Sequence, residues 1–187
     1  ATQKLKPAKY PSFSLDEERK GEIIDLVHES GRDVPLSKVR FEDGAISFIP
    51  APLGTKVGQR ISFGLNSEII DGNVISIQNI PDGTIVCNVE KQFGDGGSFI
   101  KTAGADATVF SHADDGVILK LASGKFKKLN PKNRAMIGTL AGGGVEDRPF
   151  MRAGVKMMRF KSKGQKYPIV RGVAQAAYVH PHGGGRH

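Results

Sequence analysis

The fold class is decided by residues 35–49, which read PLSKVRFEDGAISFI. Apolar and polar side chains alternate over 35–41 and again over 45–49, and an Asp-Gly pair separates the two runs. Alternation is typical of a strand with one buried face, and Asp-Gly between two such runs is a strong hairpin signal. The sequence therefore predicts a mainly β protein.

The same reading extends over the first half of the chain. Strands are expected at 60–64 and 72–77, after a Pro-rich break at 50–54. The acidic start of 15–26 favours a short helix slightly over a strand at 21–28. About five short strands suit a small barrel, so we expect an oligonucleotide-binding (OB-fold) barrel over 14–79, preceded by a basic, extended lead-in over 1–13.

The second half repeats this pattern after a joint at 79–83. Short strands are predicted at 84–90, 98–103, 107–112, 116–121, 125–129 and 134–140. They indicate a second barrel over 80–144. The glycine run Gly142–Gly144 then releases the chain into a final segment, residues 145–187, which we call the arm.

Charge is distributed unevenly between these parts. The chain has 27 Lys and Arg against 19 Asp and Glu, a formal net charge of +8. From residue 148 onward there is no acidic residue, and the nine basic ones are Arg148, Arg152, Lys156, Arg159, Lys161, Lys163, Lys166, Arg171 and Arg186. The preceding residues keep 18 basic against 19 acidic side chains. Such an arm cannot form an apolar core, and nucleic-acid phosphate is its commonest partner.

A second group of cations lies in the predicted second barrel. Lys120 and the run 125–128 flank one Ser-Gly turn, so their charged ends should converge. Most charged runs are only solvated surface, but the basic arm favours phosphate contact here. The predicted contacts in the barrels are Arg32, Lys38, Lys120, Lys125, Lys127, Lys128 and Arg134, with Lys132 nearby. Arg32 and Arg134 are the expected anchors, because arginine can bind phosphate through two hydrogen bonds.

The histidines offer a different hypothesis. His180, His182 and His187 could gather a transition metal, but no carboxylate or cysteine follows residue 148 to complete a site. A metal-dependent enzyme acting on a polyanion is therefore kept as the alternative function. The isolated His28 and His112 are interpreted as structural. The sequence predicts no cofactor, no small-molecule substrate and no enzyme activity, since it has no phosphate-binding glycine loop and no acid–base pair.

Bulk properties set the remaining expectations. Cys87 is the single cysteine, which favours a reducing, cytoplasmic setting. No apolar run is long enough for a membrane span, so no membrane partner is expected. The glycine runs Gly142–Gly144 and Gly183–Gly185 bracket the basic segment. They could be flexible linkers, but we favour backbone passing between packed RNA helices, where a Cβ atom would clash.

Several motifs resemble one family. They include IPDGTIVCNVE at 80–90, LASG at 121–124 with LK before it, the Gly run after Ala141, VRGVA at 170–174, and HPHGGG at 180–185. In order and spacing they are similar to the universal large-subunit ribosomal protein two, in its archaeal and eukaryotic form. The likeness covers nearly the whole chain and is weakest over 1–15.

This resemblance implies an OB-fold barrel, an SH3-like barrel and an extended basic arm. It implies a structural constituent of the large ribosomal subunit that binds its ribosomal RNA and contacts neighbouring ribosomal proteins. It also implies support of subunit association and an arm that approaches the peptidyl-transferase region. His180, His182, Gly183, Gly184, Gly185 and Arg186 would contact RNA. An acidic residue usually precedes the first histidine in the family, whereas Val179 stands there here. Family members continue beyond both ends of this sequence, so we expect it to be part of a longer chain.

Overall fold

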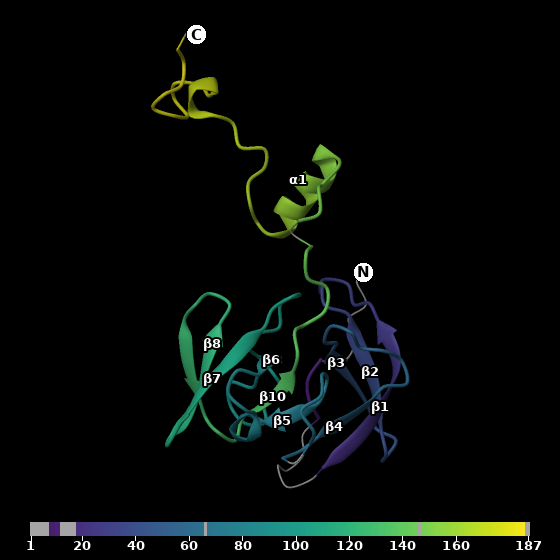
Figure 1. The fold of residues 1–187 in the computed structure, drawn as a ribbon. Coiled ribbons are helices and arrows are strands. Elements are labelled where there is room, and N and C mark those ends of the chain that lie inside the picture. Colours follow the sequence, from purple (N-terminus) through teal and green to yellow (C-terminus); the bar gives the residue numbers. More distant parts are fainter. Residues whose placement is uncertain (1–7, 12–17, 66, 146, 186–187) are drawn as a thin grey trace. The chain divides into compact units, whose positions relative to one another are not determined.

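The computed structural model describes residues 8–11, 18–65, 67–145 and 147–185. Its regular elements are mostly short strands (Figure 1), as the sequence predicts. They are β1 (Arg19–Val27), β2 (Leu36–Phe41), β3 (Ile46–Pro50), β4 (Arg60–Phe63), β5 (Val74–Ser76), η1 (Ile77–Asn79), β6 (Ile85–Cys87), β7 (Ala107–Ala113), β8 (Gly116–Leu121), β9 (Phe126–Leu129), β10 (Arg134–Ile137), α1 (Ala153–Ser162) and η2 (Gly172–Ala174).

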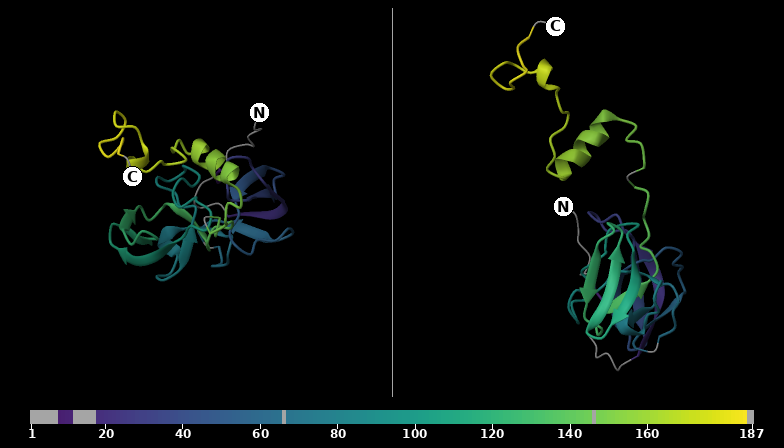
Figure 2. Two further views of the ribbon diagram at one scale, coloured as in Figure 1. Left: turned by 90° about the horizontal axis from the view of Figure 1, so that it is seen from above. Right: turned by 60° about the vertical axis from the view of Figure 1, so that its left-hand side comes forward.

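Two compact units make up the chain, one through Val145 and one from residue 146 onward. We call the first unit the body. In its described residues, ten strands form one sheet in the order β3-β2-β1-β4-β5-β10-β6-β7-β8-β9. Two further views of these strands appear in Figure 2. The predicted hairpin is confirmed, since β2 and β3 pair antiparallel with Leu36 opposite Pro50.

The prediction of a helix at 15–26 is wrong for the residues of that range that the structure describes, which begin at residue 18. Residues 19–27 form β1, which pairs with β2 on one side and with β4 on the other. Gly21 and Ile23 are buried on one face of the strand while Lys20 and Glu22 are not. Pairing on both edges outweighs the weak helical signal of the acidic residues, because tertiary context overrides local propensity.

The middle strands belong to two hydrophobic cores at once. Val74 packs into one core and its neighbour Ile75 into the other, and the same alternation separates Cys87 from Val86. Because successive side chains of a strand point to opposite faces, β5, β6 and β10 are buried on both sides. The antiparallel β5–β10 pair joins the two halves into one sheet. A division into two barrels after residue 79 stays a prediction.

One predicted strand does not form. Within 98–103 only Phe99 makes a bridge, opposite Val89. Ile100 has a φ of 56°, a left-handed conformation that interrupts extended backbone. Asn88, with a φ of 45°, ends β6 early in the same way, so the predicted strand at 84–90 shortens to 85–87.

The described part of the lead-in belongs to the body core. Tyr10 is buried against Phe63 in an edge-to-face contact with ring centroids 6.3 Å apart. Its hydroxyl donates a 2.5 Å hydrogen bond to the Asn88 carbonyl oxygen, and its amide donates to Gly96. Burial is the main reason that the pKa of Tyr10 lies well above its ordinary value. Residues 1–7, 12 and 13 lie outside the described residues.

The arm is not simply extended, which corrects the prediction. It contains the ten-residue helix α1 and a short turn of 3-10 helix, η2. No residue of 147–185 is buried, however, so the described arm has no hydrophobic core of its own. An isolated helix of this length is marginal in water, which leaves the arm's stability dependent on a partner. In the described residues, no helix is both long and apolar enough to cross a membrane.

Candidate nucleic-acid interface

One cationic surface of the body is the hairpin formed by β8 and β9. Lys120 lies opposite Phe126, and Lys128 lies opposite Ile118, on the side of the strands that faces away from Leu119 and Val117. Lys125 precedes β9 and Lys127 lies on it, and both are exposed. The structure therefore places Lys120 and Lys128 on one face of the hairpin, whereas Lys127 lies opposite Leu119 on the other face and Lys125 lies at the turn.

One member of this hairpin is already paired with an acid. The Lys128 ammonium donates a hydrogen bond to Asp115, which lies in the turn between β7 and β8. This hydrogen bond and the lysine's charge hold the pKa of the Asp115 carboxyl below its usual value. The pair is exposed, so it adds little to stability. It lowers the local net charge and makes Lys127 the better test of phosphate contact.

Arg134 does not fit its predicted role as a phosphate anchor. Its side chain is only 2% exposed, and its Nη2 donates to Glu90 Oε1 at 2.5 Å. The guanidinium also lies over the rings of Tyr10 and Phe93, about as far as cation–π contacts extend. This arginine is part of the body's interior, and we remove it from the candidate interface.

The Glu90 carboxylate explains why a charge is buried there. Its two oxygens accept the backbone amides of Gly96 and Arg134, at 3.1 and 3.0 Å, besides the guanidinium. A buried ion pair is tolerated only when such additional hydrogen bonds satisfy both partners. In the sequence Arg134 looks like one more surface cation, because its partner Glu90 lies 44 residues away.

Arg32 and Lys38 are partly available. Arg32 Nε donates to the buried carboxylate of Glu29 at 2.5 Å, and the arginine side chain is 31% exposed. Lys38 lies on β2 opposite Phe48 and is half-buried. Both remain candidates, although the ion pair fixes Arg32 close to the body.

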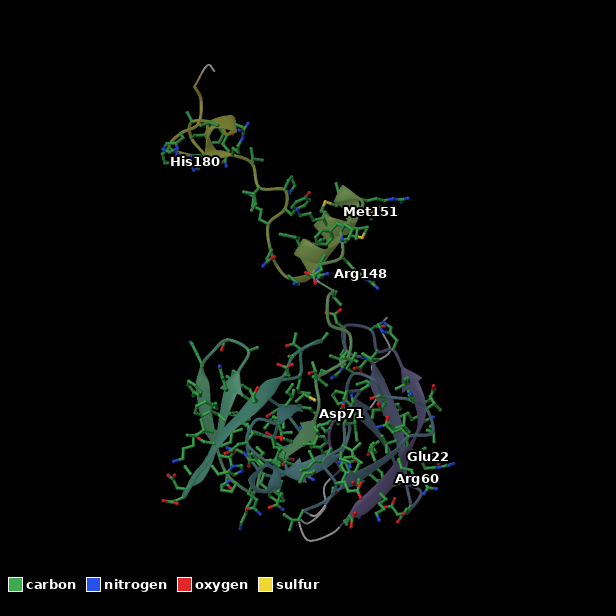
Figure 3. The ribbon with its side chains drawn as sticks, viewed as in Figure 1. Glu22, Arg60, Asp71, Arg148, Met151 and His180 are labelled. Carbon is green, nitrogen blue, oxygen red and sulfur yellow. The ribbon has the colours of Figure 1, made fainter. Side chains whose placement is uncertain are left out.

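A group of charges that sequence reasoning missed lines an open groove. Glu22 on β1 lies opposite Arg40 on β2 and opposite Arg60 on β4, and Figure 3 shows Glu22 and Arg60 side by side. Arg40 Nη2 donates to Glu22 at 3.3 Å. The groove holds about 860 Å³ and is also lined by Lys20, Glu18, Glu42 and Glu68. Acids balance the bases here, which disfavours phosphate.

The arm presents its cations around α1. Arg152, Lys161, Lys163 and Lys166 are exposed, and Arg148 lies before the helix (Figure 3). The basic residues Arg159 and Lys161 in the last turn favour the helix C-terminus, whose backbone carbonyls carry partial negative charge.

Two arm cations contact aromatic rings instead of facing solvent alone. Lys156 Nζ lies 5.8 Å from the Phe150 and Phe160 ring centroids and 5.3 Å from that of Tyr167. Arg159 also lies over Phe150. These contacts shape the arm locally while leaving its net charge uncompensated.

The terminal loop of the arm is organised around His180. The His182 amide donates to His180 Nδ1 at 3.1 Å, so the neutral imidazole carries its proton on Nε2. The two histidine rings meet edge to face, with centroids 5.3 Å apart. Val179, which precedes His180, is 58% exposed.

The glycines of this loop are required by the chain itself. A Cβ on Gly172 would lie 2.4 Å from His180 Cε1, and one on Gly183 would lie 2.4 Å from the Ala176 carbonyl oxygen. A Cβ on Gly142, in the other glycine run, would meet the Asp33 carbonyl oxygen at 2.7 Å. The predicted clash with RNA is therefore unnecessary to explain these glycines, because the clash is internal. Gly185 is exposed.

The metal hypothesis gains no geometric support. In the described ranges, no group of three or more His, Cys, Asp or Glu side chains could hold a metal ion. His187, the third histidine of the predicted set, and Arg186 lie outside those ranges. His28 follows β1, and His112 contacts Asp82 through Nδ1 at 2.7 Å, so a structural role for these histidines stays an interpretation.

Comparison with known proteins shows which family has this sequence. The family model described as Ribosomal Proteins L2, C-terminal domain, matches residues 70–187. The chain is 71% identical over 186 residues to the large ribosomal subunit protein uL2 of Cenarchaeum symbiosum, covering all of this chain and 76% of that protein.

Two other relatives agree. The large ribosomal subunit protein uL2 of Nitrosopumilus maritimus is 73% identical over 180 residues, covering 96% of this chain and 74% of that protein. That of Sulfolobus acidocaldarius is 42% identical over 185 residues, covering 99% and 77%. The predicted resemblance is confirmed: this chain belongs to the uL2 family of large-subunit ribosomal proteins.

Proposed function

We propose that this chain is a structural constituent of the large ribosomal subunit and binds its ribosomal RNA. The observation that carries the proposal is the charge of the arm. From Arg148 to Gly185 it has eight basic side chains, no acidic one and no buried residue. Phosphate neutralisation releases counterions and supplies the free energy that such a segment cannot obtain from packing.

The body contributes a second contact through the β8–β9 hairpin. Its lysines are exposed, with Lys120 and Lys128 on one face of the two strands, whereas Arg134 is not available. Lysine recognises phosphate as a point charge, and duplex RNA hides its base edges in a deep, narrow groove. The hairpin is therefore suited to reading folded shape and phosphate positions.

The finer roles implied by the family stay predictions. They are support of subunit association and approach of the arm to the peptidyl-transferase region. A place in the large ribosomal subunit, beside its RNA and neighbouring ribosomal proteins, follows from membership of the uL2 family. The uL2 relatives are named as ribosomal components, which supports a structural role and gives no reason to propose catalysis.

The test is RNA binding by a charge-reversed hairpin. Lys127→Glu with Lys128→Glu should weaken binding to large-subunit ribosomal RNA and flatten its dependence on salt, by a slope of about one for each lost phosphate contact. Lys56→Glu with Lys91→Glu makes the same change of charge at two exposed lysines elsewhere on the body, and should have the smaller effect. Equal losses from the two double variants would contradict a specific role for the hairpin.

Recovery from ribosomes tests the function as a whole. The intact chain should sediment in stoichiometric amount with purified large subunits after a wash in moderate salt. A protein that cycles on and off, such as a free translation factor, would be lost in that wash.

A further inference from the structure

The outer face of β7, β8 and β9 carries two exposed phenylalanines that no core explains. Phe110 is 54% exposed and Phe126 is 56% exposed. Their rings meet edge to face, with centroids 4.9 Å apart. Large exposed aromatic pairs on a sheet are unusual unless they contact a partner.

A β-bulge creates this pair. In the β7–β8 register Val109 lies opposite Leu119 and Ser111 lies opposite Ile118, so Phe110 is the extra residue. A bulge commonly turns a side chain away from its regular position. Phe110 thereby reaches across β8 to Phe126, which lies on β9, two strands away.

Lysines frame the pair on the same face. Lys120 lies directly opposite Phe126, at the separation of cross-strand neighbours, and Lys128 lies two residues further along β9. Lys125 stands at the turn. Asp115, the acidic side chain that the structure shows touching this group, is already paired with Lys128. The face is thus apolar at its centre and positive at its rim.

We propose that this face binds an unpaired RNA nucleotide, with its base stacked on Phe110 and Phe126 and its phosphate beside Lys120. Aromatic rings and adjacent cations are the combination that recognises single-stranded nucleotides, because every base offers a π face and carries a phosphate. An apolar segment of a neighbouring protein would use the rings but has no need of the lysines. The inference rests on the proposed RNA-binding function and names the kind of RNA element that the hairpin takes.

The experiment compares two RNA probes with the full chain. One is a single-stranded ribo-oligonucleotide that contains 2-aminopurine, and the other is a fully paired duplex of the same length. Phe126→Leu and Phe110→Leu keep an apolar side chain but remove its π face. Each should weaken binding of the single strand roughly tenfold, and leave binding of the duplex unchanged.

Conservative variants provide the matched control. Phe126→Tyr and Phe110→Tyr retain the ring, so they should bind the single strand as the parent chain does. If the leucine variants bind as tightly as the tyrosine variants, the face is an apolar docking surface for protein and the proposal is wrong. Urea unfolding of each variant shows whether a loss comes from an unfolded body.

The unmodified chain gives a second readout. The fluorescence of 2-aminopurine should fall on binding, and ultraviolet cross-linking should attach the probe to peptides holding Phe110 or Phe126. Cross-links confined to the arm would overturn the proposal but leave RNA binding intact. Failure of the RNA-binding function itself would give a different result. In that case neither Lys127→Glu nor removal of the arm would reduce the binding of RNA.

Discussion

The body and the arm of this chain treat charge in opposite ways. The body buries an Arg134–Glu90 pair, in which backbone amides donate to the glutamate and aromatic rings contact the arginine. The arm from Arg148 onward carries cations with no carboxylate of its own to meet them. Identical side-chain chemistry thus serves internal cohesion in one region and attraction of an external polyanion in the other.

The difference teaches that position in the fold, not residue type, separates a structural arginine from a binding one. A buried charge must be neutralised inside the protein, because moving it from water is costly. An exposed charge keeps its hydration and can exchange it for phosphate. Four experiments break or sharpen this contrast.

Removal of the arm gives the largest expected effect. A chain ending at Val145 should lose most of its affinity for large-subunit ribosomal RNA, because eight described cations go with the arm. A protein with six to ten phosphate contacts loses about 10³–10⁵-fold in affinity between 50 and 200 mM salt, and the shortened chain should lose far less. Filter binding over a salt series measures this.

Removal of the arm should not change the stability of the body. Its urea midpoint should match that of the full chain, since the two units are separately compact. A separate arm peptide should show no cooperative melt by circular dichroism, given its lack of buried residues. A lowered urea midpoint of the shortened chain, or a cooperative melt of the arm peptide, would contradict this contrast between body and arm.

Breaking the buried pair should act on the body alone. Arg134→Ala leaves the Glu90 carboxylate buried without its cation, which costs about 3–5 kcal/mol of folding free energy. Urea denaturation reports the loss. Replacing both partners with methionine should restore part of it, because no unpaired charge then remains. The matched arm variant Arg148→Ala should leave the unfolding midpoint unchanged.

The thiol of Cys87 reports the integrity of the body. Burial, with smaller contributions from Asp106 and Asp71, raises the pKa of this thiol from 9.0 to about 12. At pH 8 the folded chain then holds roughly a thousandfold less thiolate than an unfolded one. Alkylation should therefore be slow until urea unfolds the body.

The raised pKa of Cys87 also makes the stability of the body depend on pH in a defined direction. The folded state favours the neutral thiol. The contribution of Cys87 to the free energy of unfolding is therefore complete below pH 9.0 and is lost as pH rises toward about 12. Cys87→Ser should remove the alkylation signal entirely. Rapid alkylation of the folded parent chain at pH 8 would show that the core around β6 is open.

The smallest effect is local to the arm. Gly172→Ala must displace His180, because the new Cβ would lie 2.4 Å from its ring. We expect the NMR signals of His180 and His182 to shift, RNA affinity to fall a few-fold, and body stability to stay constant. Gly154→Ala is the control, since it adds the same methyl group in α1 where no atom lies within 4 Å. Equal effects of both changes would argue against an ordered terminal loop.

Local sequence patterns determined much of the molecule. Period-two alternation gave the β2–β3, β7–β8 and β8–β9 pairings, because a strand with one buried face must alternate. The absence of acids after residue 147 marked the arm as a partner-dependent segment. The motifs at 80–90 and 180–185 indicated the family, which the comparisons confirm.

Only the tertiary structure decided which cations are available. Arg134 and Lys127 look alike in sequence, but Glu90, 44 residues before Arg134, makes that arginine part of the interior. The bulge at Phe110 and its contact with Phe126 likewise depend on strand pairing that no local pattern encodes. The β5–β10 ladder joins distant segments for the same reason: a strand's partner is chosen by the packing of the whole sheet. Sequence thus set the strands and the charge of the arm, whereas long-range contacts set which side chains face a partner.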